Sequence, residues 1–190
     1  MASTSLWLAA GALVAGGLVP RAGVAQGLPR VVIQTELGSL EVEVDSVRVP
    51  VDAGNFLHSV DTDAYRGGTF HQTFRSDNQP EKPVKMEAIQ GGAEPANSKG
   101  APAIALESAE EKRLSENSSM SIARAADFFI CIGAQPELAF SGCGKRDGRG
   151  TGSFGKVIRG ADVVKQIQTA RAKEQRLTPP IRIVSISRTR

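Results

Sequence analysis

The sequence predicts a mainly β domain, built as a closed antiparallel barrel whose ends are capped by two helices. Strand-like alternation recurs along the chain and is strict in Leu40–Asp45, where apolar residues occupy the even positions and acidic residues the odd ones. The 20 glycines and 10 prolines favour many turns and short strands over a helical bundle. Closing the sheet would leave no strand edge exposed. The strand count alone is equally compatible with a sandwich or a ligand-binding barrel.

The domain is expected to begin with a hairpin and a helix. Val31–Thr35 and Leu40–Asp45 flank a Gly-Ser turn, which is the pattern of two paired strands. Pro50 opens a helix that runs to about Val60, because the missing N–H of proline costs nothing in the first helical turn. The apolar face of this helix consists of Phe56, Leu57 and Val60.

Six further strands and one more helix are expected. The strands are Thr69–Phe74, Val84–Gln90, Ser119–Ala123, Phe128–Gly133, Ser153–Ile158 and Ile181–Ser187. Asp162–Lys173 has apolar residues at helical spacing and predicts the second helix. The charged stretch Arg171–Arg176 is interpreted as the solvated end of that helix. The last strand is apolar on both faces, so we expect it to be covered on both sides.

An apolar leader precedes the predicted domain. Leu6–Val19 is uncharged and too short to span a bilayer comfortably. Small residues follow at Gly23 and Ala25, where a signal peptidase requires them. We therefore expect residues 1–25 to be a signal peptide and residues 26–190 to form the domain, in the periplasm or outside the cell.

Composition excludes several classes of function. The net charge is only +3, the basic residues are scattered and aromatic residues are few, so nucleic acid is not an expected partner. Two cysteines and two histidines lie far apart without ligand spacing, so no metal or other cofactor is expected. Cys131 and Cys143 permit one disulfide, although Cys131 stands in an apolar run that is typical of a buried thiol. The cleaved chain is expected to be a monomer that does not insert into membranes.

Four sequence blocks carry a family resemblance. They are Phe70-His71-Gln72, Ile89-Gln90-Gly91-Gly92, Phe128-Phe129-Ile130-Cys131 and Phe154-Gly155-Lys156-Val157. In this order they resemble the framework of the cyclophilin-type peptidyl-prolyl cis-trans isomerases, from about Val31 to Ser187. Asp77–Pro80 and Pro136–Phe140 are similar to an exported bacterial branch of the family. The resemblance implies a closed, eight-stranded cyclophilin-like barrel capped by two helices.

The implied activity is isomerisation of X-Pro bonds, which would assist the folding of exported proteins. The barrier to rotation about a peptide bond is about 18–20 kcal/mol because of amide resonance, whereas the two isomers before proline are close in energy. A catalyst therefore needs a pocket that binds the twisted amide better than either planar form, and no nucleophile. A hydrogen-bond donor beside the prolyl nitrogen helps, because the nitrogen lone pair is freed as resonance is lost. The expected partners are proline-containing peptides or unfolded exported proteins.

The resemblance also implies site residues. Phe129 would form the floor of the proline pocket and Leu138 a wall, Gln90 would donate its amide to the substrate backbone, and Ala123 would line the neighbouring groove. Phe70 and His71 precede the catalytic position and are included among the substrate contacts. Judged without the resemblance, Phe129 and Leu138 read as core residues, Gln90 as the cap of a turn and His71 as a structural histidine.

The catalytic position falls on Gln72, where the family usually has arginine. Hydrogen bonds to charged groups contribute about 1.5–3 kcal/mol, against roughly 0.5–1.5 for neutral ones, so a loss of about tenfold to a hundredfold in rate is expected. Arg75 is a poor substitute, because an odd offset along a strand points to the opposite face. Glu87 and Ala88 also replace a large apolar pair, and the loop before Phe128 is short. These departures favour, as the alternative function, a non-catalytic peptide- or protein-binding module on the same barrel.

Overall fold

The computed structural model describes residues 27–80, 85–94, 119–124, 127–133 and 153–189, with the backbone alone for 119–124. The predicted signal peptide lies outside these residues. Within the described ranges, no helix is both long and apolar enough to cross a membrane.

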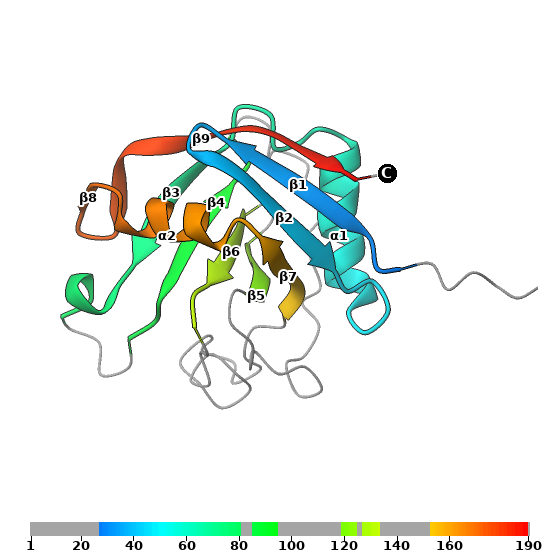
Figure 1. The fold of residues 1–190 in the computed structure, drawn as a ribbon, viewed down its shortest axis with the longest axis horizontal. Helices are drawn as coiled ribbons and strands as arrows, with labels where there is room; N and C mark the ends of the chain where they lie inside the picture. The colour runs from blue at the N-terminus through cyan, green and yellow to red at the C-terminus, as the bar shows by residue number, and fades with distance from the viewer. Residues whose placement is uncertain (1–26, 81–84, 95–118, 125–126, 134–152, 190) are drawn as a thin grey trace, which may run out of the picture.

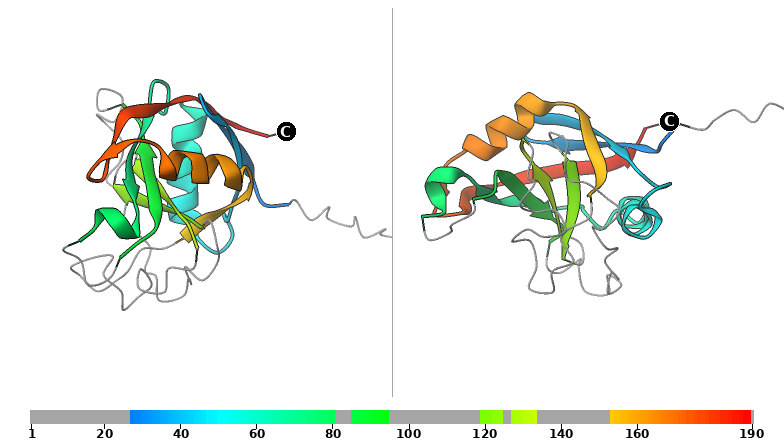
Figure 2. Two further views of the ribbon diagram at one scale, coloured as in Figure 1. Left: turned by 60° about the vertical axis from the view of Figure 1, so that its left-hand side comes forward. Right: turned by 90° about the horizontal axis from the view of Figure 1, so that it is seen from below.

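The fold is mainly β with two helices, as predicted. In chain order the elements are β1 (Arg30–Thr35), β2 (Gly38–Val44), α1 (Pro50–Asp61), β3 (Thr69–Phe74), the 3-10 turn η1 (Ser76–Asn78), β4 (Ala88–Gly92), β5 (Ser119–Arg124), β6 (Asp127–Cys131), β7 (Ser153–Arg159), α2 (Ala161–Thr169), β8 (Ala172–Lys173) and β9 (Arg176–Arg188). The strands form one curled antiparallel sheet in the order β1-β2-β7-β5-β6-β4-β3-β9-β8, and β1 also pairs with β9 (Figure 1). The helices α1 and α2 lie on opposite sides of the curled sheet (Figure 2).

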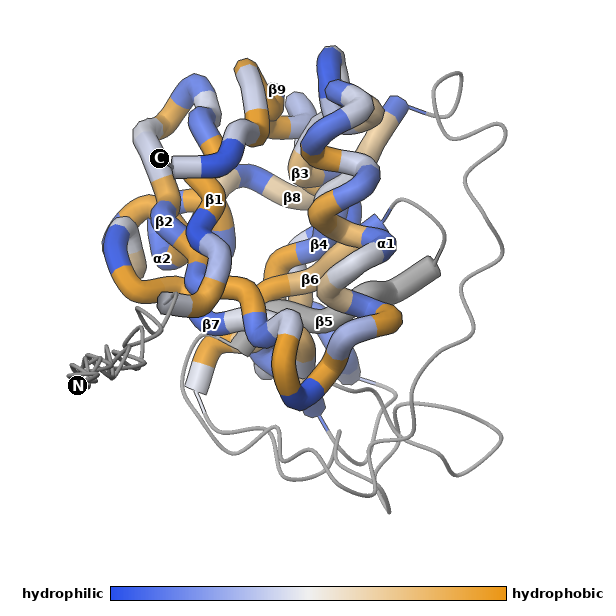
Figure 3. The backbone as a smooth tube through the Cα atoms, turned by 90° about the vertical axis from the view of Figure 1, so that its right-hand side faces the viewer, coloured by the Kyte–Doolittle hydropathy of each residue, from blue (hydrophilic) through white to orange (hydrophobic). Residues whose placement is uncertain are grey.

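The core forms on the inner face of the sheet. In β1 and β2, apolar side chains alternate with polar ones and point inward, and Figure 3 shows this alternation of hydropathy along the tube. One aromatic cluster joins α1 to the middle of the sheet; its members are Phe56, Tyr65, Phe70, Phe128 and Phe154. Burial in this cluster raises the pKa of the Tyr65 hydroxyl.

The first glycine of the Gly-Gly pair that ends β4 has a packing reason. A Cβ added at Gly91 would lie 2.7 Å from Cδ1 of Phe70 and 3.0 Å from the carbonyl oxygen of Thr69. The backbone of β4 therefore passes directly against the Phe70 ring, which only glycine allows. The facing Gly68 is packed still more tightly, because a Cβ added there would lie 2.2 Å from the carbonyl oxygen of Gly92.

The predicted second helix is too long. It ends at Thr169, because Ala170 adopts an extended conformation (φ −61°, ψ 160°) and the Gln168 carbonyl accepts a hydrogen bond from Thr73 Oγ1 at 2.8 Å. The charged stretch Arg171–Arg176 therefore does not end a helix; most of it forms the β8–β9 hairpin.

The strand expected at Val84–Gln90 instead spans Ala88–Gly92. Just before β4, the Met86 backbone bonds to the Gln79 side chain, so this part of the chain pairs with η1 and not with a strand.

The last strand is not covered on both faces as expected. Its inward-facing apolar residues shift from odd to even positions because β9 has one extra residue in its pairing with β1. Gln34 opposes Ser185 there, whereas Thr35 opposes Ile183. Ile183 and Ile186 both point into the core, while Val184 between them is 50% exposed. The two apolar faces seen in the sequence are thus one inner face interrupted by a bulge.

An ion pair fastens the end of β9 to α1 and predicts acid sensitivity. Arg188 donates two hydrogen bonds to Asp61, at 2.7 and 2.6 Å, which lower the pKa of the Asp61 carboxyl. Because the folded-state pKa is the lower one, the pair stabilises the fold above the unfolded pKa of about 3.9, and this contribution is lost as pH falls through the folded value. We expect the urea midpoint to fall between about pH 6 and pH 3, and to fall less in Asp61→Asn. An equal fall in both proteins would contradict the prediction.

Candidate functional site

Three of the predicted site residues form one row across the sheet. In the β3–β4 pairing Gln72 stands opposite Gln90, and in the β4–β6 pairing Gln90 stands opposite Phe129. Residues directly opposite each other on antiparallel strands point to the same face. All three side chains are partly buried, whereas their neighbours Thr73, Ile89 and Phe128 are fully buried on the core side. The row Gln72–Gln90–Phe129 therefore lies on the outer face of the sheet.

A bulge in β3 separates Phe70 from this row. The pairings of β3 with β4 and with β9 both shift between Phe70 and Gln72, which leaves His71 unpaired. Phe70 is fully buried, and its ring meets Phe128 edge-on at a centroid distance of 5.8 Å. Inclusion of Phe70 among the substrate contacts was therefore wrong, because its side chain belongs to the core.

His71 and Gln90 converge on Asp127, a residue that the sequence reasoning missed. Gln90 Nε2 donates to Asp127 Oδ2 at 3.2 Å, and His71 Nε2 lies 3.9 Å from the same oxygen. His71 Nδ1 is 3.3 Å from the carbonyl oxygen of Thr69. The only sequence signal for Asp127 was its place at the head of the Phe-Phe-Ile strand. The bond orients the Gln90 amide and leaves its second N–H and its oxygen for a peptide.

An apolar floor lies beside the row. Phe129 and Met86 pack against the buried Cys131, which shares the outer face of β6 with Phe129. In the next register Ala88 stands opposite both Cys131 and Phe74, so its small side chain occupies the middle of the floor.

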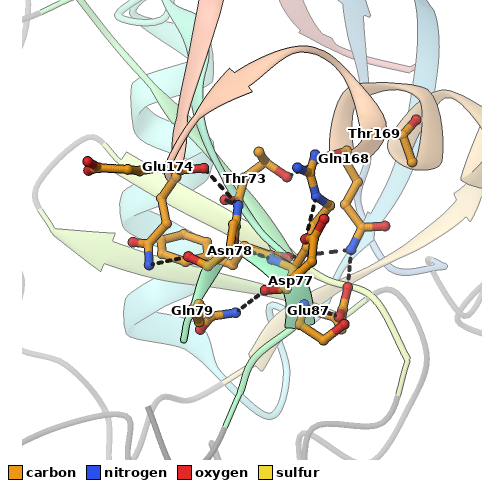
Figure 4. A network of polar contacts seen from close by, with 12 residues as sticks. Thr73, Asp77, Asn78, Gln79, Glu87, Gln168, Thr169 and Glu174 are labelled. Carbon is orange, nitrogen blue, oxygen red and sulfur yellow. Dashed lines mark hydrogen bonds and ion pairs between the residues drawn. The ribbon is translucent and has the colours of Figure 1, made fainter. Parts of the chain in front are cut away.

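The charge of Glu87 does not enter this floor. Glu87 precedes Ala88 and so points to the opposite face of the chain from Gln90. Its carboxylate accepts hydrogen bonds from the Ser76 amide at 2.8 Å and from the Gln168 side chain. Figure 4 shows these contacts as part of a polar network between η1, α2 and the β8–β9 turn. Glu87 is thus a structural residue that fastens β4 to α2.

Arg75 is occupied elsewhere in the same network. One guanidinium nitrogen donates to the carbonyl oxygens of Gln168 and Ala170, at 3.1 and 3.5 Å, and Nε donates to Asp77 at 3.0 Å. The bond from Arg75 lowers the pKa of the Asp77 carboxyl. The bulge in β3 precedes Gln72, so it does not bring Arg75 round to the outer face. These bonds agree with the expectation that Arg75 is a poor substitute for the missing arginine.

The remaining predicted residues are only partly described. Ala123 lies in β5, which pairs with β6 beside Phe129, but the description there is of the backbone alone. Leu138 and Cys143 lie outside the described residues. Within the described ranges, no group of three or more His, Cys, Asp or Glu side chains could hold a metal ion.

Known proteins match this chain over most of its length. The family model described as "Cyclophilin type peptidyl-prolyl cis-trans isomerase/CLD" matches residues 30–188. A peptidyl-prolyl cis-trans isomerase of Acinetobacter baylyi is 32% identical over 169 residues, which cover 82% of this chain and 80% of the relative. Peptidyl-prolyl cis-trans isomerase A of Dickeya dadantii is 30% identical over 155 residues, which cover 73% and 72%.

The fold itself matches solved structures. The crystal structure of a Cryptosporidium parvum cyclophilin type peptidyl-prolyl cis-trans isomerase, determined in the presence of the dipeptide Ala-Pro, has a TM-score of 0.65 to this chain. The match covers 85% of this chain and 99% of the other, at 21% identity.

Proposed function

Because the chain belongs to the family of cyclophilin-type peptidyl-prolyl cis-trans isomerases, we propose that it isomerises X-Pro bonds on the outer-face row Gln72–Gln90–Phe129. The observation that carries the assignment of the site is the register of β3, β4 and β6, which aligns these three side chains on one face. Proline-containing segments of unfolded exported proteins are the substrates. The Ala-Pro dipeptide that was present with the related Cryptosporidium parvum protein supports a proline-containing ligand.

Each residue of the row has its own role in binding or catalysis. Phe129, with the partly buried Met86 beside it, holds the proline ring, and the Gln90 amide, oriented by Asp127, bonds to the peptide backbone. Gln72 offers a neutral N–H toward the prolyl nitrogen. Binding of the ring and backbone keeps the peptide in place while the amide rotates, and a donor at the nitrogen stabilises the twisted form selectively. Because Gln72 is neutral, the activity is expected to be weakened unless another residue of the fold supplies a positive charge beside the nitrogen.

Export and closure of the barrel belong to the same proposal. The apolar leader and its small residues at Gly23 and Ala25 support cleavage after residue 25 and a periplasmic or extracellular location. The mass of the protein recovered from an exporting cell tests this, and retention of the leader on a cytoplasmic product would refute it.

The additional β1–β9 pairing supports a closed barrel of the eight longer strands.

Replacing Gln90 with alanine tests the proposed function. We expect the purified full-length chain to accelerate exchange between the cis and trans forms of a short Ala-Pro peptide, measured by exchange NMR. Gln90→Ala should raise KM about two- to tenfold with kcat little changed, because a neutral hydrogen bond that is made throughout the reaction is lost. Gln166→Ala, on the exposed face of α2, is the matched control and should behave as the unmodified chain.

Failure of this test has a defined meaning. If the unmodified chain binds the peptide without accelerating exchange, the proposed catalysis is wrong and the chain is a peptide-binding module. If exchange is accelerated but Gln90→Ala equals its control, the isomerase stands and the row is not its site.

A further inference from the structure

Arg176 lies beside Gln72 at the end of the outer-face row. In the β3–β9 pairing Gln72 stands opposite Arg176, just as it stands opposite Gln90 on its other side. The Thr73 amide donates to the carbonyl oxygen of Gln175 at 2.8 Å, which is the bond expected next to a non-hydrogen-bonded pair. In such pairs the Cα atoms are only about 4.5 Å apart and the side chains are closest. Arg176 therefore extends the row from β4 and β3 onto β9.

The burial pattern puts the Arg176 side chain on the same face as the row. Leu177, the next residue, is 1% exposed and points into the core, whereas Arg176 is exposed. Arg75 and Arg188 both make ion pairs, with Asp77 and Asp61. Among the residues that the structure describes, the Arg176 guanidinium has no hydrogen-bonding or ionic partner. It is available for a substrate.

The hairpin that carries Arg176 is fixed against β3. Asn78 Nδ2 donates to the carbonyl oxygens of Thr73 and Glu174, both at 3.0 Å, and the Gln175 side chain donates to the Asn78 carbonyl oxygen at 3.5 Å. Figure 4 shows Asn78 between Thr73 and Glu174. The turn residues are thereby held on the strand that carries Gln72. A residue on a supported element loses less freedom when it engages a substrate.

We propose that Arg176 is a catalytic residue that supplies the positive charge missing at position 72. This inference rests on the proposed isomerase function and deepens it. When the prolyl amide twists, its nitrogen lone pair becomes an acceptor, and a charged donor stabilises it more than a neutral amide does. The arginine side chain is longer than that of its neighbour glutamine, so its guanidinium can reach past Gln72 toward the same reacting atom. No bond is made or broken in the reaction, so no co-reactant is needed.

A double-mutant cycle tests the role of Arg176. The full-length chain, Arg176→Ala, Gln72→Arg and the double variant are compared by exchange NMR on the Ala-Pro peptide. Arg176→Ala should lower kcat about tenfold to a hundredfold with KM and the urea midpoint unchanged, because the charge acts in the twisted state. Arg176→Lys should retain part of the rate. Arg182→Ala removes another exposed arginine of β9, opposite Thr69 at the far end of β3, and should stay within about twofold.

The cycle separates this inference from the proposed function. Gln72→Arg should add little to the unmodified chain but should restore the Arg176→Ala variant at least about tenfold, because either arginine then supplies the charge. If the unmodified chain is active and Arg176→Ala keeps its kcat within about twofold, the inference is wrong while the isomerase stands. A chain without any activity, by contrast, would overturn both. If Arg176→Ala also lowers the urea midpoint, Arg176→Gln is measured in its place, because it keeps the aliphatic part of the side chain and removes only the charge. The same limit of about twofold in kcat then decides.

Discussion

Replacing Phe128 with alanine is expected to lower the free energy of unfolding by about 3–5 kcal/mol. The Phe128 side chain is completely buried, and its ring lies edge-on to Phe56, Tyr65 and Phe70 at centroid distances of 5.9, 5.5 and 5.8 Å. Edge-to-face pairs add to the energy of burial. Domains of this size are stable by only about 5–15 kcal/mol in total, so this single change removes a large share.

Urea unfolding followed by far-ultraviolet circular dichroism measures the loss. Phe128→Leu should recover part of it, because the leucine fills some of the cavity and keeps the apolar contact. Phe129→Ala is the matched control: it removes the same side chain one residue further along β6, on the outer face, where it is only partly buried. A loss below about 1.5 kcal/mol in Phe128→Ala, or an equal loss in both alanine variants, would contradict the assignment of Phe128 to the core.

Much of the fold was predictable because local patterns agree with it. Strict alternation identified the strand that follows Gly38, and Pro50 together with its apolar face identified α1 from its first residue to within one residue of its end. The errors arose where distant residues decide the local structure. The segment after Thr169 has helix-forming residues, but Thr73 and Arg75 both donate to the carbonyl oxygen of Gln168 in the last turn of α2, and the chain then turns into a hairpin.

The candidate site was predictable only as separate pieces. The motifs drew attention to Gln72, Gln90 and Phe129 individually, but their alignment depends on the order β3–β4–β6, in which β6 is not β4's neighbour in the sequence. Asp127 and Arg176 carry no motif and could not be found from spacing alone. They belong to the site because strand register places them beside Gln90 and Gln72.

Phe129→Ala is expected to leave the domain folded and to remove most of its activity. The side chain packs on Cys131 and Met86 at the outer face and joins no ring of the core cluster. Burying an apolar side chain or ring is worth about 1.5–3 kcal/mol. Removing the pocket floor should therefore lower kcat/KM for the Ala-Pro peptide about tenfold to a hundredfold. Phe129→Leu, which keeps an apolar floor, should recover much of the loss.

The kinetic form of the loss is as informative as its size. Phe129 contacts the proline ring in the planar and in the twisted amide alike, so its removal should appear mainly in KM. Arg176 is expected to act only on the twisted amide, so its removal should appear in kcat. If Phe129→Ala left kcat/KM within about twofold while the protein stayed folded, the proline ring would not bind at this row. The reacting nitrogen would then not lie beside Gln72 and Arg176, and neither residue would be catalytic. A rise mainly in KM for Phe129→Ala, together with a fall mainly in kcat for Arg176→Ala, would instead place the proline ring on β6 and the reacting nitrogen between β3 and β9.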